Sequence, residues 1–235
     1  MCTDCGCGDV NLVPLELQTR ILARNDDTAS HNRAHLGERG IFTINLMGSP
    51  GSGKTAVLEA TARAFKDGRK LAAIAGDLAT ENDATRLERA GIRSRAIETG
   101  QACHLDAEMV HHELHHFDLT GVEYLFIENV GNLVCPAVYD LGQNANVVAL
   151  SVTEGEDKPL KYPTMFAKAD AVLLTKTDLL PHLDVDVAVI YHALARVVPD
   201  PIVIPLASRQ PGGVDAWVDW LKQRREALVG ELVLS

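Results

Sequence analysis

The sequence has no apolar run long enough for a membrane helix. About 18 consecutive apolar residues are needed to span a bilayer, and no stretch of the 235 residues approaches that length. The N-terminus also lacks a basic segment followed by an apolar one, the pattern of a secretory signal peptide. We therefore expect a cytoplasmic protein with no membrane partner.

Clustered positive charge is scarce as well. The formal net charge is -10, and the short basic segment at 222–225 does not reverse it. A nucleic-acid surface needs a basic stripe that displaces counterions from phosphates. The composition therefore predicts that the chain does not bind nucleic acid.

The cysteines do not have the pattern of a disulfide framework. Three of the five, Cys2, Cys5 and Cys7, fall within the first seven residues, and a cytoplasmic protein keeps its thiols reduced. Gly6 and Gly8 allow the backbone of this segment to fold around one ion that the three thiolates bind. The α-amine of Cys2 would be a fourth ligand after removal of Met1. Such donors suit Ni²⁺ in square-planar or Zn²⁺ in tetrahedral geometry. An unstructured reduced tail is the alternative.

Residues 48–55, Gly-Ser-Pro-Gly-Ser-Gly-Lys-Thr, form a complete G-x-x-x-x-G-K-[ST] phosphate-binding loop between an apolar strand and a helical pattern. Loop N–H groups and the helix N-terminus hold polyphosphate. Lys54 is expected to reach the β and γ phosphates, and the Thr55 hydroxyl to bind Mg²⁺. The predicted ligand is a nucleoside triphosphate with Mg²⁺.

Short apolar segments alternate with helical patterns along nearly the whole chain. Near-continuous apolar runs are typical of parallel strands buried on both faces. The pattern predicts an α/β, three-layer P-loop NTPase fold with a mostly parallel sheet of about seven strands flanked by helices. The expected strands are 41–47, 71–75, 94–98, 124–127, 146–152, 171–174 and 201–205, and the expected helices are 56–66, 81–90, 105–116, 160–168, 185–197 and 213–229.

The chain divides into two parts on this pattern. Residues 1–38 are predicted to form an N-terminal metal-binding tail and a helical extension, with a helix around 15–23 followed by a polar stretch. Residues 39–235 are predicted to form the nucleotide-hydrolysing domain.

Acidic residues follow the second and fourth predicted strands. The segment 128–131, Glu-Asn-Val-Gly, resembles the D-x-x-G switch of GTPases with Glu128 in place of Asp, and Gly131 is placed to sense the γ phosphate. We expect Thr55, Asp77 and Glu128 to hold Mg²⁺, and Lys54, Asp77, Asp83 and Glu128 to form the catalytic set. For Asp77 and Asp83, helix capping is the alternative.

The segment 175–178, Thr-Lys-Thr-Asp, resembles the N-K-x-D motif that selects guanine. Asp178 can accept hydrogen bonds from N1 and N2 of guanine, whereas adenine has no donor at N1. Lys176 would lay its stem along the base. Thr175 replaces an Asn whose amide normally braces the loop, so we expect this bracing to be lost and guanine specificity to be relaxed. As an alternative, Asp178 caps a turn before Pro181.

The predicted nucleotide-binding set combines the phosphate loop, the switch and the base motif with one residue after the last strand. It comprises Gly48, Ser49, Pro50, Gly51, Ser52, Gly53, Lys54, Thr55, Ala56, Gly131, Thr175, Lys176, Asp178 and Ala207.

The sequence contains a second set of candidate metal ligands, but local sequence alone does not establish that they bind the same ion. Cys103 and His104 precede a helix that begins near Leu105, and Cys135 lies four residues after Gly131. If the three share an ion, its affinity will depend on the nucleotide. Buried structural cysteines are the alternative. A water or a facing subunit would supply the fourth ligand.

Histidines also recur at i, i+4 spacing. The pairs are His31 with His35, His111 with His115, and His112 with His116. Such pairs can bind a metal ion on one helix face, but a solvated helix face has the same pattern.

The combined motifs resemble the HypB family of hydrogenase nickel-incorporation GTPases, which belong to the SIMIBI class. The matching segments are 1–7 (MCTDCGC), 48–55 (GSPGSGKT), 76–77 (GD), 100–106 (GQACHLD) and 128–136 (ENVGNLVCP), and the resemblance extends to 212–217. It implies GTP hydrolysis to GDP, a homodimer in the GTP state, and nickel delivery to [NiFe]-hydrogenase. A second nickel accessory protein and the hydrogenase large subunit are the implied partners.

The resemblance also assigns the metal sites. It implies a tight Ni²⁺ site at Cys2, Cys5 and Cys7, and a second Ni²⁺ or Zn²⁺ site at the dimer interface made by Cys103, His104 and Cys135. The chain departs from the family at Thr175 and lacks a long polyhistidine tract, so bulk nickel storage is not expected.

Three other functions remain open on the sequence. The related urease accessory GTPases carry a Cys-Pro-His motif, but here Cys135-Pro136 is followed by Ala137. A nickel or zinc storage protein with a structural nucleotide site would show no turnover. A small-molecule kinase would need a second substrate pocket, for which no motif is evident.

Overall fold

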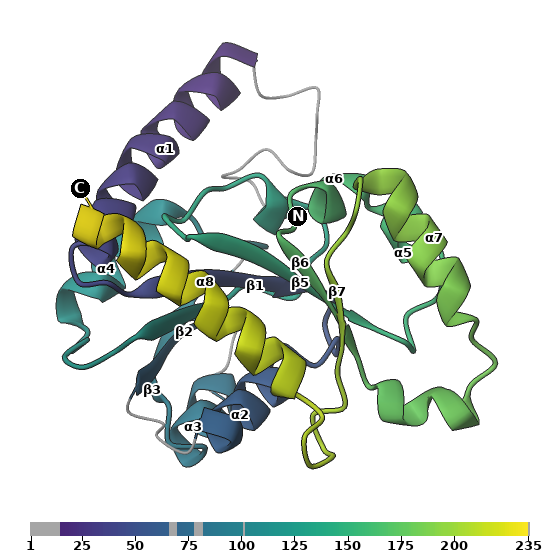
Figure 1. The fold of residues 1–235 in the computed structure, drawn as a ribbon. Coiled ribbons are helices and arrows are strands. Elements are labelled where there is room, and N and C mark those ends of the chain that lie inside the picture. Colours follow the sequence, from purple (N-terminus) through teal and green to yellow (C-terminus); the bar gives the residue numbers. More distant parts are fainter. Residues whose placement is uncertain (1–14, 66–69, 78–81, 101, 235) are drawn as a thin grey trace.

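The computed structural model describes residues 15–65, 70–77, 82–100 and 102–234 (Figure 1). The predicted tail site at Cys2, Cys5 and Cys7 lies outside these residues.

A parallel sheet of seven strands forms the middle layer of the described chain, in the order β3-β2-β4-β1-β5-β6-β7. The strands are β1 (Phe42–Gly48), β2 (Leu71–Asp77), β3 (Arg93–Glu98), β4 (Tyr124–Glu128), β5 (Ala145–Ser151), β6 (Ala171–Thr175) and β7 (Val203–Pro205). This arrangement confirms the predicted fold class, because each expected apolar segment is a strand of a parallel sheet.

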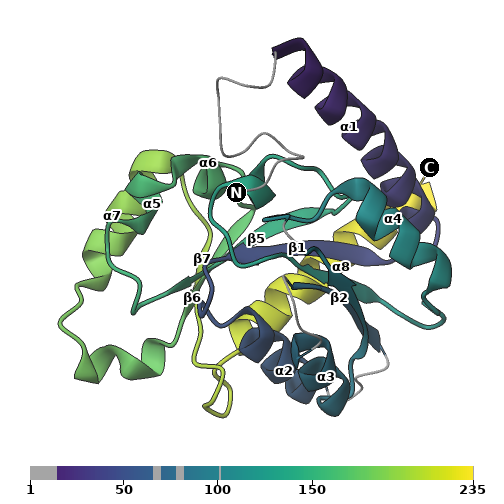
Figure 2. The ribbon, with the colours of Figure 1, turned by 180° about the vertical axis from the view of Figure 1, so that it is seen from behind.

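Helices cover both faces of the sheet. They are α1 (Leu15–Gly37), α2 (Lys54–Phe65), α3 (Asn82–Arg89), α4 (Ala107–His116), α5 (Lys158–Lys161), α6 (Pro163–Ala167), α7 (Val187–Val197) and α8 (Asp215–Leu234). Figure 1 shows α2, α3 and α8 on one face. Figure 2, from behind, shows α1 and α4 at one end of the other face and α6 and α7 at the opposite end. No helix among the described residues is long and apolar enough to cross a membrane.

Alternate residues of the central strands build the hydrophobic core on each face of the sheet. Phe42, Ile44 and Leu46 of β1 pack with α2 and α8, whereas Met47 packs on the opposite face with α6 and α7. Because side chains alternate across a strand, a central strand must be apolar on both faces. This explains why the strands read as continuous apolar runs.

The first helix is longer than predicted because its polar residues are docked. The amide of Asn25 donates to the carbonyl of Asp140 at 2.8 Å and accepts from the N–H of Ala107 at 2.9 Å. Asn32, which is fully buried, donates to the carbonyl of Ala107 at 3.0 Å. These bonds offset the cost of burying amides, so the polar stretch after the expected helix at 15–23 is helical too.

The predicted helix at 160–168 is two short helices instead. The break falls at Tyr162, whose ψ of 54° is outside the helical range. Pro163 disfavours helical dihedrals in the residue before it, and that residue is Tyr162.

Candidate nucleotide site and metal cluster

The phosphate loop joins the end of β1 to the start of α2, as predicted from its sequence. Gly48, Gly51 and Gly53 have φ values of 149°, 75° and 98°. Residues other than glycine rarely adopt these backbone conformations. A Cβ on Gly48 would lie 2.5 Å from the carbonyl oxygen of Ala149. The loop therefore depends on glycine both for its backbone dihedrals and for its close approach to β5.

The side chain of Lys54 folds back onto the phosphate loop. Its Nζ donates to the carbonyl oxygens of Gly48 and Ser49 at 3.3 and 3.2 Å, and the residue is 8% exposed. The ammonium thus lies inside the loop, where phosphate oxygens bind in P-loop proteins.

Three oxygen-bearing side chains converge at the start of α2. The Thr55 hydroxyl lies 2.7 Å from Oε1 of Glu128 and 3.0 Å from Oδ1 of Asp83. The second oxygen of Glu128 is buried and has no hydrogen-bond partner among the described residues. Mg²⁺ prefers such hard oxygen donors, so the residues present fit this ion.

Glu128 is buried at the end of β4, with 3% exposure. Burial raises its pKa to about 7, while the hydrogen bond from Thr55 and the charge of Lys54 act in the opposite direction. A carboxyl that titrates near neutrality responds strongly to a cation beside it.

A cavity of about 370 Å³ opens beside these groups and is lined by the phosphate loop, α3 and the segment 128–131. Arg86 of α3 also lines this cavity and bonds both oxygens of Glu59 at 3.0 and 3.1 Å. Sequence reasoning missed Arg86 as a site residue. Its place three residues after Asp83, on the same helix face, was the available signal.

Asp77 and Asp83 have different outcomes. Asp77 ends β2, and its backbone pairs in register with Glu98 of β3. The structure describes the backbone of Asp77 and not its side chain. Asp83 is in the first turn of α3 and faces Thr55. The structure therefore brings Asp83 to the predicted magnesium residues.

Thr175 braces the phosphate loop, contrary to expectation. Its fully buried hydroxyl donates to the carbonyl of Ser52 at 2.6 Å. The prediction that the loop loses its brace is wrong, because a hydroxyl on β6 reaches the loop as a longer amide would. Lys176 adds a second bond, from Nζ to the carbonyl of Gly51 at 2.7 Å, from a left-handed residue with φ of 59°.

Asp178 and Ala207 lie on two segments that are tied together beyond the sheet edge. Asp178 is in the short 3-10 helix Thr177–His182, and the backbone N–H of Thr177 donates to the carbonyl of Leu206 at 3.0 Å. Ala207 follows Leu206 and donates its N–H to Gly213 at 3.0 Å. The nucleotide-binding role of both residues, and the selection of guanine by Asp178, stay predictions.

Cys103, His104 and Cys135 come together, which local sequence left open. Their ligand atoms lie within 4.8 Å of one another. The Cys103 sulfur is 2.9 Å from the Cys135 sulfur and 3.7 Å from Nδ1 of His104. Two thiols and an imidazole are donors that suit Ni²⁺ and Zn²⁺.

Burial favours the neutral form of the His104 imidazole. It is 5% exposed, and its burial lowers its pKa, although Asp106 acts in the opposite direction. Its ring stacks on Tyr139 with centroids 4.0 Å apart and planes 18° apart. A neutral imidazole binds metals, so the buried, stacked ring is already in the form that a metal requires.

The metal cluster and the phosphate loop share a contact through Asn132. The backbone of Asn132 forms an antiparallel bridge with Gly48, and its side-chain amide donates to the carbonyl of Cys103 at 3.3 Å. Gly131 packs so closely on Pro50 that a Cβ would lie 2.9 Å from its ring. The segment from Glu128 to Cys135 thus touches both sites.

Comparison with known proteins gives consistent results. A model of the CobW/HypB/UreG nucleotide-binding domain matches residues 42–204. The hydrogenase maturation factor HypB of Azotobacter vinelandii is 49% identical over 211 residues, covering 90% of this chain and 70% of that protein.

Two solved structures are similar throughout. The crystal structure of HypB from Helicobacter pylori in complex with nickel has a TM-score of 0.82 and 38% identity, covering 87% of this chain and 96% of that one. HypB from Archaeoglobus fulgidus has a TM-score of 0.79 and 38% identity, covering 87% and 100%.

Proposed function

The chain belongs to the HypB branch of the CobW/HypB/UreG family, and we propose that it is a GTP-hydrolysing nickel metallochaperone that assists nickel insertion into [NiFe]-hydrogenase. The family confirms the resemblance inferred from the motifs. Its members are P-loop nucleotide hydrolases. The similar protein of Azotobacter vinelandii is named a hydrogenase maturation factor, and the similar structure from Helicobacter pylori is a complex with nickel.

One observation carries the proposal. The Cys103–His104–Cys135 cluster lies on the same segments that contact the phosphate loop. A storage protein has no need for this connection. A chaperone needs it, because nickel must be held in one nucleotide state and released in the other.

We propose that GTP occupies the cavity above the phosphate loop. Loop N–H groups and Lys54 bind the phosphates, and Thr55, Asp83 and Glu128 hold Mg²⁺, with Asp77 nearby on β2. The bound Mg²⁺ neutralises charge on the β and γ phosphates. Asp178 selects guanine, and the hydroxyl of Thr175 keeps the loop in place for the nucleotide.

The proposed output is a movement of Cys135. Gly131 packs on Pro50 and so registers whether a γ phosphate is present, and the four residues that follow lead to Cys135. No described residue is placed as a general base, so positioned water and electrostatic stabilisation account for slow turnover. Hydrolysis then withdraws Cys135 and loosens the nickel ligands.

Dimerisation in the GTP state belongs to the same proposal. Val134 and Val138 flank Cys135 and are 56% and 42% exposed. Apolar side chains beside an incomplete ligand set fit an interface at which a second copy supplies the remaining ligand. The tail cysteines Cys2, Cys5 and Cys7 would form the separate tight Ni²⁺ site.

Complementation tests this function. In a strain that lacks its own hydrogenase maturation factor, the chain should restore [NiFe]-hydrogenase activity, and the Lys54→Ala and Cys103→Ala variants should not. Urease activity measured in parallel tests the urease alternative, which the Cys135-Pro136-Ala137 sequence disfavours. Equal rescue by Lys54→Ala would instead support a storage protein with a structural nucleotide site.

A further inference from the structure

Four histidines from two helices meet where α1 packs on α4. His31 and His35 are one turn apart on α1, and His111 and His115 are one turn apart on α4. Ring centroids lie 5.0 Å apart for His31 and His111, 6.5 Å for His35 and His115, and 4.4 Å for His111 and His115. The two i, i+4 pairs of the sequence therefore form one interhelical cluster.

The orientation of His111 is fixed by a buried amide. Asn32 donates its Nδ2 to the carbonyls of Ala107 and Leu141 at 3.0 and 3.2 Å, so its Oδ1 must act as an acceptor. That oxygen lies 2.9 Å from Nδ1 of His111. Neutral His111 therefore carries its proton on Nδ1, and Nε2 keeps its lone pair. An amide or carbonyl oxygen holds metal-binding histidines in this way.

The free nitrogen of His111 points at a second histidine. Its Nε2 lies 2.9 Å from Nε2 of His115. Two nitrogens bound to one tetrahedral ion at about 2.0–2.1 Å are about 3.3 Å apart, so a small rotation of the exposed His115 ring places both at ligand separation.

Burial and the neighbouring imidazoles of His115 and His31 lower the pKa of His111. Burial and the charge of Arg39 lower that of His35. Both rings are thus in the neutral form that binds metals. The acidic neighbours are Glu108 for His111 and Glu38 for His35.

We propose that His111 and His115, with the exposed ring of His31 turning toward them to complete the ligand set, form a site for a divalent transition ion such as Ni²⁺ or Zn²⁺, bound through nitrogen alone and separate from the cysteine sites. Imidazole donors suit these ions. The proposal does not rest on the nucleotide-linked function, because none of these residues lines the phosphate cavity. An ion there would tie α1 to α4.

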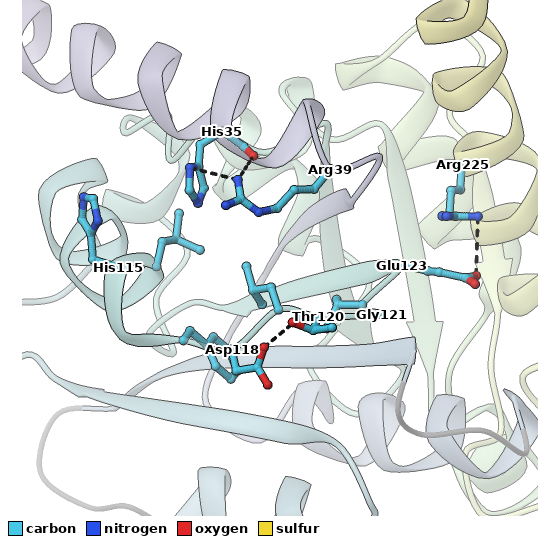
Figure 3. A pocket seen from close by; sticks show the side chains of 12 residues that line it. His35, Arg39, His115, Asp118, Thr120, Gly121, Glu123 and Arg225 are labelled. Atoms are coloured by element: carbon cyan, nitrogen blue, oxygen red, sulfur yellow. Dashed lines mark hydrogen bonds and ion pairs between the residues drawn. The ribbon is translucent and has the colours of Figure 1, made fainter.

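His35 is the fourth member and is restrained by a cation. Nη1 of Arg39 lies 3.1 Å from Nδ1 of His35 and donates to its carbonyl at 2.8 Å. Figure 3 shows this pair, with His115 on the neighbouring helix; all three line a cavity of about 730 Å³. The cavity gives an ion access, and the Arg39 charge opposes it. Removing that charge should therefore strengthen binding.

The chain supplies a matched control on α4. His112 and His116 are also an i, i+4 pair, with ring centroids 5.2 Å apart. Among the described residues, their recorded ring contact is with each other and not with α1. If two surface histidines at i, i+4 spacing were enough to bind the ion, His112 and His116 would bind it as tightly as His111 and His115 do.

The test uses the full chain with all five cysteines, Cys2, Cys5, Cys7, Cys103 and Cys135, changed to alanine, titrated with Ni²⁺ and with Zn²⁺ by calorimetry. We expect one remaining ion per chain, with a cobalt absorption spectrum free of thiolate charge transfer. His31→Ala and His115→Ala should each weaken binding by about 10-fold or more, whereas His112→Ala with His116→Ala should change it by less than about 2-fold. Arg39→Gln should tighten it.

Other results overturn the proposal. They are the absence of binding in the cysteine-free background, an equal loss in the His112 and His116 control, or no effect of His31→Ala. The last result would leave a pair on α4 alone. Far-ultraviolet circular dichroism of each variant shows whether α1 and α4 remain folded; because the substituted histidines are exposed or half-buried, unchanged spectra are expected.

Discussion

The side-chain oxygen of Asn129 accepts the backbone N–H of Leu105 at 3.2 Å. Asn129 directly follows Glu128 of the nucleotide site, and Leu105 directly follows Cys103 and His104 of the metal cluster. Asn129 is 1% exposed, and its amide also donates to Oδ1 of Asn45 at 3.0 Å. One buried side chain thus joins the end of β4 to the segment that carries two metal ligands.

Replacing Asn129 should uncouple the two sites. Asn129→Ala leaves the N–H of Leu105 buried and unpaired, at a cost of about 1–3 kcal/mol in unfolding free energy. Nickel affinity at the Cys103 cluster should then be nearly the same with GDP and with a GTP analogue. Denaturant unfolding and nickel titration measure the two effects.

Asn45→Ala is the matched control for this change. It removes the acceptor of the Asn129 amide but leaves the Leu105 bond, so it should lower stability and preserve the nucleotide effect on nickel affinity. If both variants lose that effect equally, the Asn129–Leu105 bond is not the connection.

Glu128 should make the nucleotide-free, metal-free protein less stable as pH rises. A folded-state pKa of about 7, against the ordinary 4.5, means that the folded state keeps a proton that the unfolded state has released. Stability is therefore lost between about pH 4.5 and 7, by up to about 3 kcal/mol. Denaturant unfolding at both ends of this range should show a decline that Glu128→Gln reduces. Parallel curves for the two proteins would contradict this assignment.

The hydroxyl of Thr175 should matter for nucleotide binding. Thr175→Val keeps the shape of the side chain but leaves the Ser52 carbonyl without its donor. Losing such a bond costs about 1 kcal/mol, which is about 5-fold in affinity for a fluorescent GDP analogue. Thr175→Ser retains the hydroxyl and should bind nearly as the natural sequence does. Equal weakening by Val and Ser would show that the bond is not the cause.

Asp178 should determine base choice. Asp178→Asn sets an amide donor against the N1 and N2 donors of guanine, so GTP affinity should fall by about 10-fold or more while ATP affinity changes little. Competition binding with both nucleotides gives the ratio. An unchanged ratio would favour the alternative in which Asp178 caps a turn.

The sheet and the phosphate loop were predictable because their signals are local. Buried parallel strands read as apolar runs, and residues 48–55 must be glycine-rich to fold around phosphate. The length of α1 was not predictable, since Asn25 and Asn32 are polar and become buried only through hydrogen bonds to residues more than 70 positions away.

The connections within the site are also long-range. Thr175 bonds Ser52 across 123 positions, and its short side chain gave no sign that it would reach the loop. Cys103 and Cys135 are candidate metal ligands by residue type, but their meeting depends on long-range contacts between the segment after β3 and the segment after β4. The sequence alone therefore indicated the candidates without their pairing. The division at residue 38, the cytoplasmic location and the tail site stay predictions.

The central claim is that nucleotide state sets nickel affinity at the Cys103–His104–Cys135 cluster. The direct measurement is nickel titration of the variant with Cys2, Cys5 and Cys7 changed to alanine, once with GDP and once with a non-hydrolysable GTP analogue, with Cys103→Ala added as the control that removes the cluster. We predict tighter binding with the analogue, by about 5-fold or more as for ordinary allosteric coupling, and no such difference in the control. Identical affinities in the two nucleotide states would contradict the account.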